Sequence, residues 1–325
     1  MRKAFADTLT HVAAQNPRVI LLTGDLGFQV FDEFHARFGP RYVNVGIAEA
    51  QMITAAAGLA LEGWRPVAYS IASFATARAF EQIRISVNYP NLPIVVAGAG
   101  GGYTYASSGV THHAADDLCL MSALPMMTVV APGDANEVAQ LLPQVFQLAG
   151  PSYFRVGRYG EATYHADEPA VLGRARFLRD GERIAVVSTG DMASVVLQAV
   201  TILNSDGIYP IVYQMHTVKP LDTDSLDRLA GRVDTIITVE EHVPVGGLSA
   251  AVKAWRASRQ TGPRIERIGP PDSLALGNLK REELRRRFKY DAESIAEACR
   301  LASRASPWEP RTLLRDIQNH RGQSI

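Results

Sequence analysis

Cysteine is scarce in this sequence. The chain of 325 residues contains two cysteines, Cys119 and Cys299, which are too few for a disulfide framework or a thiolate zinc site. We interpret both as small apolar side chains in the core. This cysteine usage fits a reducing cytoplasm.

Long apolar runs and an excess of charge of one sign are also missing. No apolar segment approaches the roughly 18–20 residues of a membrane span, and the N-terminus begins with an amphipathic pattern instead of a signal peptide. Lys+Arg and Asp+Glu both number 33, so the formal net charge is zero. Since nucleic acids and anionic membranes attract basic proteins, we expect neither as a partner, and we expect a cytoplasmic location.

Several catalytic signatures are absent as well. There is no phosphate-binding Gly-x-x-x-x-Gly-Lys-Ser/Thr loop, no dinucleotide fingerprint and no nucleophile elbow. The glycine-rich stretch 98–102 is not followed by an amphipathic helix. His112 and His113 are adjacent, but no His-x-x-x-His or His-x-His pair accompanies them, so we predict no metal site built from side chains of this chain.

The pattern that is present alternates short apolar runs with longer helical ones. Continuous apolar runs without alternation are typical of parallel strands buried on both faces. In the first half we predict strands at 19–22, 67–69, 92–97, 127–130 and 153–156, and helices at 2–14, 48–61, 74–87, 113–122 and 135–148. This order predicts a doubly wound α/β domain over residues 1–157.

A second α/β series follows a polar stretch. Residues 158–180 are rich in turn formers, and we predict a linker there. Over 181–305 we predict strands at 184–188, 211–213 and 235–239 and helices at 193–204, 222–229, 247–258 and 292–302. Residues 306–325 are polar, and we predict a peripheral tail. The fold class is therefore α/β with two doubly wound domains.

Glu49 is the first candidate for chemistry. If a helix begins near it, its side chain shares one face with apolar residues at offsets of three, four, seven and eleven, namely Met52, Ile53, Ala56 and Ala60. A carboxylate at the head of such a stripe points toward the interior, where it is costly unless paired or used. The alternative is a first-turn glutamate favoured by the helix dipole.

Two further features could contact a ligand. Residues 107–113 place Ser, Thr and His side chains after the glycine-rich stretch 98–102. We interpret them as a helix N-terminus whose exposed His and Thr, next to a flexible glycine stretch, suit substrate contact, or as a polar loop in which Thr111 caps a helix. Arginines near predicted strand ends or helices can bind anions or form surface ion pairs; they are Arg2, Arg78, Arg84, Arg155 and Arg158.

At this point the sequence resembles the C-terminal half of transketolase, and in particular the C-terminal subunit of split, two-chain transketolases. The resemblance covers about residues 1–303. The motifs Asn-Val-Gly-Ile-Ala-Glu at 44–49 and Gly-Val-Thr-His-His at 109–113 carry it in the first half. In the second half it rests on Lys-Pro-Leu-Asp at 219–222 and on Glu-Glu-His followed by Gly-Gly-Leu within 240–248.

The resemblance implies thiamine diphosphate chemistry. It implies that the first domain binds the aminopyrimidine and that the second is a transketolase C-terminal domain. Glu49 would be catalytic, because this carboxyl group shares a proton with the pyrimidine ring in the family. Phe74 resembles the aromatic residue that packs against the ring, and Arg78 on the same segment would also belong to the cofactor site.

The resemblance also implies a partner chain. The family holds Mg²⁺ and the diphosphate with Gly-Asp-Gly followed by Asn, whereas each Gly-Asp here, at 24–25, 133–134 and 190–191, lacks the second glycine. We therefore expect a separate N-terminal subunit that carries that motif and holds Mg²⁺, in an α2β2 assembly. Self-association through the same fold and a small-molecule sugar substrate are further expectations.

Only some of the family's substrate-contacting residues are found in this sequence. His112 matches the histidine nearest the reacting carbons and would be catalytic, and Arg158 and Arg2 match arginines that bind the sugar phosphate. The phosphate-holding histidine of the family falls at Gly100. The aspartate that contacts the C3 hydroxyl falls at Ser108.

Two more positions in the substrate site also differ: Gln29 replaces a serine and His113 replaces a glutamine. The resemblance thus implies transfer of a two-carbon ketol unit from a ketose or ketose phosphate to an aldehyde, with altered recognition. The alternatives are a 2-oxoacid-decarboxylating enzyme, either a 2-oxoacid dehydrogenase beta subunit or a deoxyxylulose-phosphate-synthase-like protein, and a non-catalytic regulatory subunit. No role is assigned to Arg155, His216 or His242.

Overall fold

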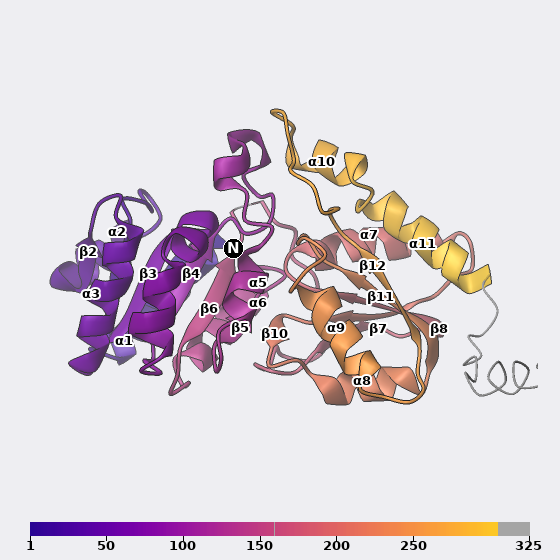
Figure 1. The fold of residues 1–325 in the computed structure, drawn as a ribbon, viewed down its shortest axis with the longest axis horizontal. Coiled ribbons are helices and arrows are strands. Elements are labelled where there is room, and N and C mark those ends of the chain that lie inside the picture. Colours follow the sequence, from indigo (N-terminus) through magenta and orange to yellow (C-terminus); the bar gives the residue numbers. More distant parts are fainter. Residues whose placement is uncertain (159, 305–325) are drawn as a thin grey trace, which may run out of the picture.

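Two mostly parallel sheets organise the computed structural model, which describes residues 1–158 and 160–304 (Figure 1). The two α/β units lie side by side, and the chain passes from the first to the second through residues 160–175. This architecture confirms the predicted fold class. The tail expected at 306–325 lies outside the described residues.

The first sheet has seven strands in the order β10-β5-β6-β4-β3-β1-β2, and all pairs are parallel except β10 with β5. The strands are β1 (Val19–Thr23), β2 (Tyr42–Asn44), β3 (Arg65–Ile71), β4 (Val95–Ala99), β5 (Thr128–Val130), β6 (Ser152–Val156) and β10 (Thr217–Lys219). The strands β1, β4 and β6 are buried along their whole length, as their continuous apolar runs predict.

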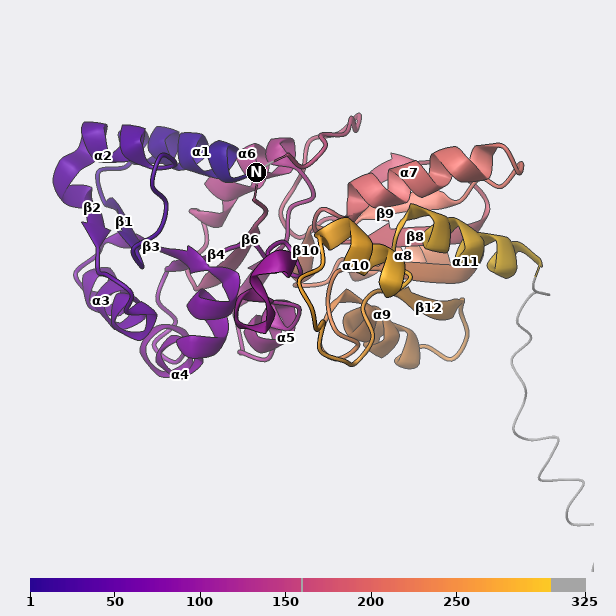
Figure 2. The same ribbon diagram turned by 90° about the horizontal axis from the view of Figure 1, so that it is seen from above.

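Helices cover both faces of this sheet (Figure 2). One face packs against α1 (Arg2–Gln15), α2 (Asp32–Phe38) and α6 (Ala135–Val145). The other packs against α3 (Glu49–Leu61), α5 (Asp117–Ser122) and a helical segment at 74–88. That segment is not the single α-helix predicted, because wide π-turns at Phe74–Arg78 and Ile83–Asn88 flank the short α4 (Phe80–Gln82). Such turns are often found at functional sites.

The second sheet has the order β12-β11-β8-β9-β7. Its strands are β7 (Arg176–Arg179), β8 (Arg183–Ser188), β9 (Ile211–Gln214), β11 (Val233–Val239) and β12 (Arg264–Ile268). One face packs against α7 (Met192–Asn204) and α11 (Ala292–Arg304), and the other against α8 (Thr223–Ala230) and α9 (Leu248–Ala257). The short α10 (Arg281–Arg287) lies beside the first unit.

The structure differs from the sequence predictions at several boundaries. β7 lies within the segment predicted as a linker, because its residues pair with β9 at the edge of the second sheet. The helix predicted from residue 113 begins only at Asp117, so Thr111 does not cap it. The sequence patterns also did not reveal β2, β7, β10, β12, α2 and α10, which are short or lie at sheet edges.

One strand links the two units. β10 lies in the second half of the sequence but pairs antiparallel with β5 of the first sheet, with Thr217 opposite Val130. The amide of Ala131 donates to the carbonyl of His216 at 2.7 Å, and the Lys219 ammonium donates to the carbonyl of Ser122 at 2.9 Å. The first sheet is therefore completed by the second half of the chain.

Within residues 1–158 and 160–304, no helix has the length and apolar character needed to cross a membrane.

His216 is buried at this junction. It is fully buried, its Nδ1 lies 3.0 Å from the Thr217 hydroxyl, and its Nε2 has no hydrogen-bond partner among the described residues. Burial lowers the pKa of His216 to about 4; nearby Arg176 adds to this effect and Asp222 opposes it. The ring is therefore neutral in the folded protein near neutral pH.

This burial predicts a pH-dependent loss of stability. The unfolded histidine has a pKa near 6.5, so between about pH 6.5 and pH 4 the unfolded state binds more protons and is favoured. The free energy of unfolding of the wild type should fall by about 2–3 kcal/mol more than that of His216→Gln between about pH 7 and pH 4. Denaturant titrations of the chain measure the difference. His165→Gln is the control, because the ring of His165 is 89% exposed; parallel pH curves for wild type and His216→Gln would contradict the expectation.

Candidate active site

The predicted site residues gather at the carboxyl edge of the first sheet. Adjacent parallel strands β1, β3, β4 and β6 end at this edge, and the loops that follow them carry Gln29, Phe74, His112 and Arg158. Ligands bind at the carboxyl ends of strands in open α/β sheets, where the strand order reverses. Here the order reverses around β1, whose neighbours are β2 and β3.

Glu49 occupies the first turn of α3, and its carboxylate is buried. The residue is 1% exposed, and its apolar neighbours at offsets of three, four, seven and eleven are all buried as predicted. Ser70 donates to Oε1 at 2.9 Å, and the Arg78 guanidinium donates to Oε2 at 2.7 Å. A Cβ atom at Gly24 would lie 3.3 Å from Oε1, so the backbone closes tightly around this oxygen.

The helix dipole alone does not account for this arrangement. A first-turn glutamate that only serves the dipole can stay in water, whereas burying a carboxylate costs free energy unless hydrogen bonds and charge offset it. Ser70 and Arg78 provide that compensation. The Arg78 side chain is 46% exposed, so the Oε2 side of Glu49 faces the solvent-accessible part of the site.

Three planar side chains lie together beside Glu49. The guanidinium carbon of Arg78 lies 4.3 Å from the centre of the Phe74 ring. The centre of the His112 ring lies 5.2 Å from that of Phe74 in an edge-on orientation, and the His112 Nδ1 is 3.0 Å from the Thr111 hydroxyl. The structure thus brings together Glu49, Phe74, Arg78 and His112.

The glycine-rich stretch before His112, which the sequence predicts to be flexible, is packed into the fold, whereas Thr111 beyond it is exposed as predicted. Residues 98–102 are buried, the Gly100 amide donates to the carbonyl of Val156 at 2.7 Å, and Gly102 pairs with Ala114. Gly100 has φ +76°, and a Cβ there would overlap with the Tyr105 ring. Tyr105 therefore fills the space that a side chain at position 100 would need.

Tyr105 also connects two predicted substrate residues. The centre of its ring lies 6.2 Å from that of the His112 ring, and the guanidinium carbon of Arg158 lies over the Tyr105 ring, 5.5 Å from its centre. The backbone amide of Arg2 donates to the carbonyl of Arg158 at 3.2 Å, so the two arginines expected to bind an anion lie next to one another. Sequence reasoning did not single out Tyr105.

The remaining predicted substrate residues are placed less closely. His113 is engaged by its own loop, since its Nε2 lies 3.0 Å from the Ala106 carbonyl and its ring packs edge-on against Tyr103. Ser108 lies at the end of a 3-10 turn. Gln29 is exposed and has φ +62°. Its backbone amide donates to the Asp32 carboxylate. Among the contacts of residues 1–158 and 160–304, none joins Gln29 to Glu49.

Two residues without an assigned role prove to be structural. Arg155 forms a bidentate ion pair with Asp117 at 2.9 and 2.8 Å, and the Tyr153 hydroxyl donates to the same carboxylate at 2.6 Å. Both charges are buried. The Nε2 of His242 accepts from the amide of Cys119 at 3.1 Å while Nδ1 donates to the Val243 carbonyl. The Asp117 contacts hold α5 against β6 within the first unit, and the His242 hydrogen bond joins α5 to the second unit.

Sequence reasoning also missed Ser70 as a partner of Glu49. Its position offered one signal, because it is a hydroxyl near the carboxyl end of an otherwise apolar strand. Phe74, Arg78 and Glu49 were named from their motifs, but no local pattern placed Ser70 opposite them.

A cavity of about 460 Å³ adjoins the site. It lies between the two units, and it is lined on one side by Thr104, Ser107 and Arg158 and on the other by residues of α7 and α10. Both acidic and basic side chains line it.

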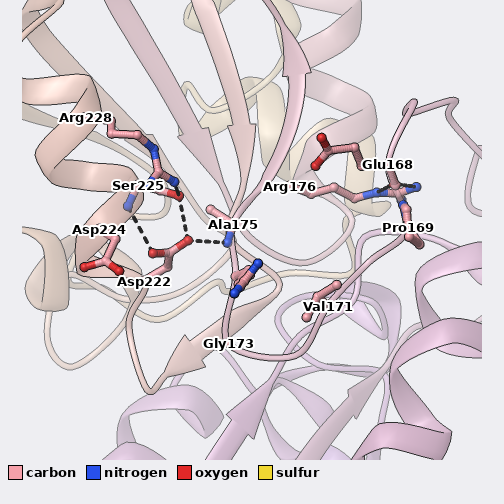
Figure 3. Close-up of a pocket in the computed structure, with 11 residues that line it drawn as sticks. Glu168, Pro169, Val171, Gly173, Ala175, Arg176, Asp222, Asp224, Ser225 and Arg228 are labelled. Atoms are coloured by element: carbon pink, nitrogen blue, oxygen red, sulfur yellow. Dashed lines mark hydrogen bonds between the residues drawn. The ribbon is translucent and has the colours of Figure 1, made fainter.

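A second cavity, of about 450 Å³, lies elsewhere and is lined by none of the predicted site residues (Figure 3). Its central carboxylate, Asp222, accepts from the amides of Ala175 and Ser225 and so caps α8. In the part of the chain that the structure describes, no group of three or more His, Cys, Asp or Glu side chains could hold a metal ion.

Comparisons with known proteins agree with this geometry. The sequence matches the transketolase pyrimidine-binding domain family over residues 1–159 and the transketolase C-terminal domain family over residues 173–295. One of the subunits of the apulose-4-phosphate transketolase of Phocaeicola vulgatus is 32% identical over 300 residues, which cover 91% of this chain and 95% of that protein.

Two further matches come from one long enzyme and one solved structure. The 1-deoxy-D-xylulose-5-phosphate synthase of Chlorobaculum tepidum is 33% identical over 91% of this chain, which spans 47% of that enzyme. A split-gene transketolase solved as an inactive beta4 tetramer is 31% identical and has a TM-score of 0.84, covering 93% of this chain and 97% of that one. With these matches spanning both units, the chain belongs to the transketolase family.

Proposed function

We propose that this chain is the catalytic subunit of a thiamine-diphosphate-dependent enzyme that transfers a two-carbon ketol unit from a ketose or ketose phosphate to an aldehyde. The observation that carries the proposal is the buried Glu49 carboxylate, with one oxygen fixed by Ser70 and the other facing Phe74 and Arg78. Membership in the transketolase family supports the choice of cofactor.

The residues around Glu49 fit an aminopyrimidine. The Arg78 guanidinium is a planar N–H donor that bonds Oε2 and lies against the Phe74 ring, and a pyrimidine ring presents the same planar face and ring-edge hydrogen bond. We infer that Phe74 packs against the ring, that Arg78 borders it, and that Glu49 binds its edge. Thiamine diphosphate supplies carbanion-stabilising chemistry when bound.

Glu49 would move the proton. Ser70 donates to Oε1 and Arg78 donates to Oε2. Since the Arg78 side chain is 46% exposed whereas Ser70 is buried, a ring nitrogen would replace the Arg78 hydrogen bond, and Oε2 would be the oxygen that shares a proton with it. A positioned acid–base group of this kind contributes about 10²–10⁴-fold to a rate. His112 packs edge-on against Phe74, and we propose that it contacts the reacting carbons of the substrate.

The diphosphate and its metal would be held by another chain. Each Gly-Asp aspartate of this chain already has a structural partner: Asp25 bonds Asn44, Asp134 caps α6, and Asp191 pairs with Arg281. We propose that a separate N-terminal subunit carrying Gly-Asp-Gly followed by Asn holds Mg²⁺ in an α2β2 assembly. The Phocaeicola relative is named as one subunit of its transketolase, which supports a two-chain enzyme.

Substrate binding is proposed for the residues at the rim of the site. Arg2 and Arg158, whose backbones are joined by a hydrogen bond, would bind an anionic group, because a guanidinium group can recognise phosphate bidentately. Gln29, Ser108 and His113 remain proposed contacts from the loops around it.

A 2-oxoacid-decarboxylating reaction is the second candidate. The similarity to deoxyxylulose-phosphate synthases over both units supports it. The geometry at Glu49 is compatible with both candidates, because the two chemistries would use the same proton transfer there. The substrates separate them, since a decarboxylating enzyme consumes a 2-oxoacid and releases carbon dioxide.

Reconstitution tests the proposal. The chain is purified alone and with its N-terminal partner, and ketol transfer is measured with thiamine diphosphate, Mg²⁺, a ketose phosphate and an aldehyde. We expect no transfer by the chain alone and transfer by the complex. Transfer by the chain alone would refute the need for a partner, and release of carbon dioxide from a 2-oxoacid without ketol transfer would favour the second candidate.

Glu49→Gln should abolish most of this activity. The amide keeps the shape of the side chain but cannot share a proton, so kcat in the complex should fall by about 10²–10⁴-fold. Glu62→Gln, at the exposed C-terminal end of the same helix, is the matched control and should change kcat by less than about twofold. Activity of Glu49→Gln within about threefold of wild type would point to a non-catalytic chain.

Ser108 should determine how sharply C3 epimers of the donor are distinguished. With no carboxylate there to accept the hydrogen bond of the C3 hydroxyl, wild type should discriminate weakly. Ser108→Asp should raise the epimer ratio of kcat/KM by about 10- to 100-fold, since a charge-assisted hydrogen bond contributes about 1.5–3 kcal/mol. Ser107→Asp, one exposed residue away, controls for added charge. An unchanged ratio in Ser108→Asp would place the C3 hydroxyl elsewhere.

A further inference from the structure

The loop that carries His112 and His113 is held by the second unit. Between β4 and α5, the amide of Tyr103 donates to Oε1 of Glu241 at 2.8 Å, across 138 residues of sequence. The Tyr103 ring packs edge-on against His113, with ring centres 5.0 Å apart. Glu241 is thus one hydrogen bond and one ring contact away from a proposed substrate residue.

Glu241 is the centre of a buried charge cluster. It is 1% exposed. Its carboxylate accepts hydrogen bonds from two arginines of α10, from Arg281 at 2.6 Å and from Arg285 at 3.1 Å. Asp191 pairs with both arginines from the other side. Burial alone would raise the pKa of Glu241, but the two arginines outweigh it and lower this pKa to about 2, so the carboxylate is ionised near neutral pH.

The loop packs closely against the Glu241 carboxylate at Gly102. Gly102 has φ +62°, and a Cβ there would lie 2.6 Å from Oε1 of Glu241. Apolar contacts extend the same interface, since Tyr103 and Ala106 of the loop pack in one cluster with Ala275 and Leu284 of the second unit. Any shift of Glu241 therefore acts directly on residues 102–106.

The neighbouring Glu240 provides an internal contrast. It follows the same strand, β11, and is equally buried. Its carboxylate accepts from the amides of Leu248 and Ser249 at 2.6 and 3.0 Å and lies 3.5 Å from Arg267. All of these partners belong to the second unit, so Glu240 stabilises α9, and none of its side-chain hydrogen bonds within the described residues reaches the loop.

We infer that Glu241, held by Arg281 and Arg285, is a positioning residue for the reaction proposed above: it fixes loop 102–113 and thereby the placement of His112 and His113. This inference rests on the proposed function for its catalytic meaning. Its physical reason is that reacting groups must be held within a fraction of an ångström, and a misplacement of about 1 Å can cost about 10²-fold in rate.

Hydrogen exchange on the full chain tests the positioning without any activity. In Glu241→Gln we expect the amides of residues 102–114 to exchange at least about tenfold faster, because an ionised acceptor is lost. In Glu240→Gln the increase should fall on residues 247–250 and leave the loop unchanged. Unchanged exchange in the loop of Glu241→Gln would overturn the inference.

Kinetics of the assembled complex test the catalytic part. Glu241→Gln should lower kcat by about tenfold or more, with a smaller change in KM, whereas Glu240→Gln should lower thermal stability but keep kcat within about twofold of wild type. Equal effects of both variants on kcat would show a merely structural role and refute the inference. If Glu241→Gln does not fold, Arg285→Gln, a partly exposed side chain, takes its place with the same expectations. Loop exchange that responds as expected in a complex without ketol transfer would refute the proposed function alone.

Discussion

The structure around the site depends on one constraint, which is that the carboxylate of Glu49 is kept out of water. A buried carboxylate must be compensated, and here the compensation comes from a strand end and from a helical segment: Ser70 on β3 and Arg78 on the π-turn that follows it. The Ser70 hydrogen bond thereby joins α3 to β3, which otherwise pack through apolar side chains. Phe74 is then placed beside the carboxylate by its position one turn before Arg78.

The second unit contacts the first sheet and the loop that carries His112. β10 closes the edge of the first sheet, the Arg155–Asp117 pair holds α5, and the carbonyl of Glu241 accepts from Arg155 at 3.2 Å. These contacts are charged or backbone-mediated and buried, so they fix geometry more than they add net stability. The loop with His112 is therefore clamped from both ends, by Gly102 on one side and α5 on the other.

Sequence patterns predicted the parts of this arrangement that are local. Continuous apolar runs predicted the buried strands, and the offsets after Glu49 predicted an inward-facing carboxylate. The predicted start at residue 113 was wrong because His113 is extended and Ala114 pairs with Gly102, so the helix begins only at Asp117. Ser70, Tyr105 and Glu241 could not be predicted as partners of the site, because their placement depends on packing between segments, and the contacts of Ser70 and Glu241 span 21 and 138 residues.

The position of Tyr105 shows why motif matching alone describes the substrate site poorly. Gly100 was matched to a histidine of the family by resemblance alone, and the sequence alone suggests a simple loss. In the structure the left-handed backbone of Gly100 lets the Tyr105 ring occupy the space where a Cβ would be, so the glycine is required by the tyrosine. The ring then packs between His112 and Arg158. In the proposed substrate site this packing puts an aromatic surface between His112 and Arg158, so under the proposed function apolar contact would be part of how a substrate is recognised.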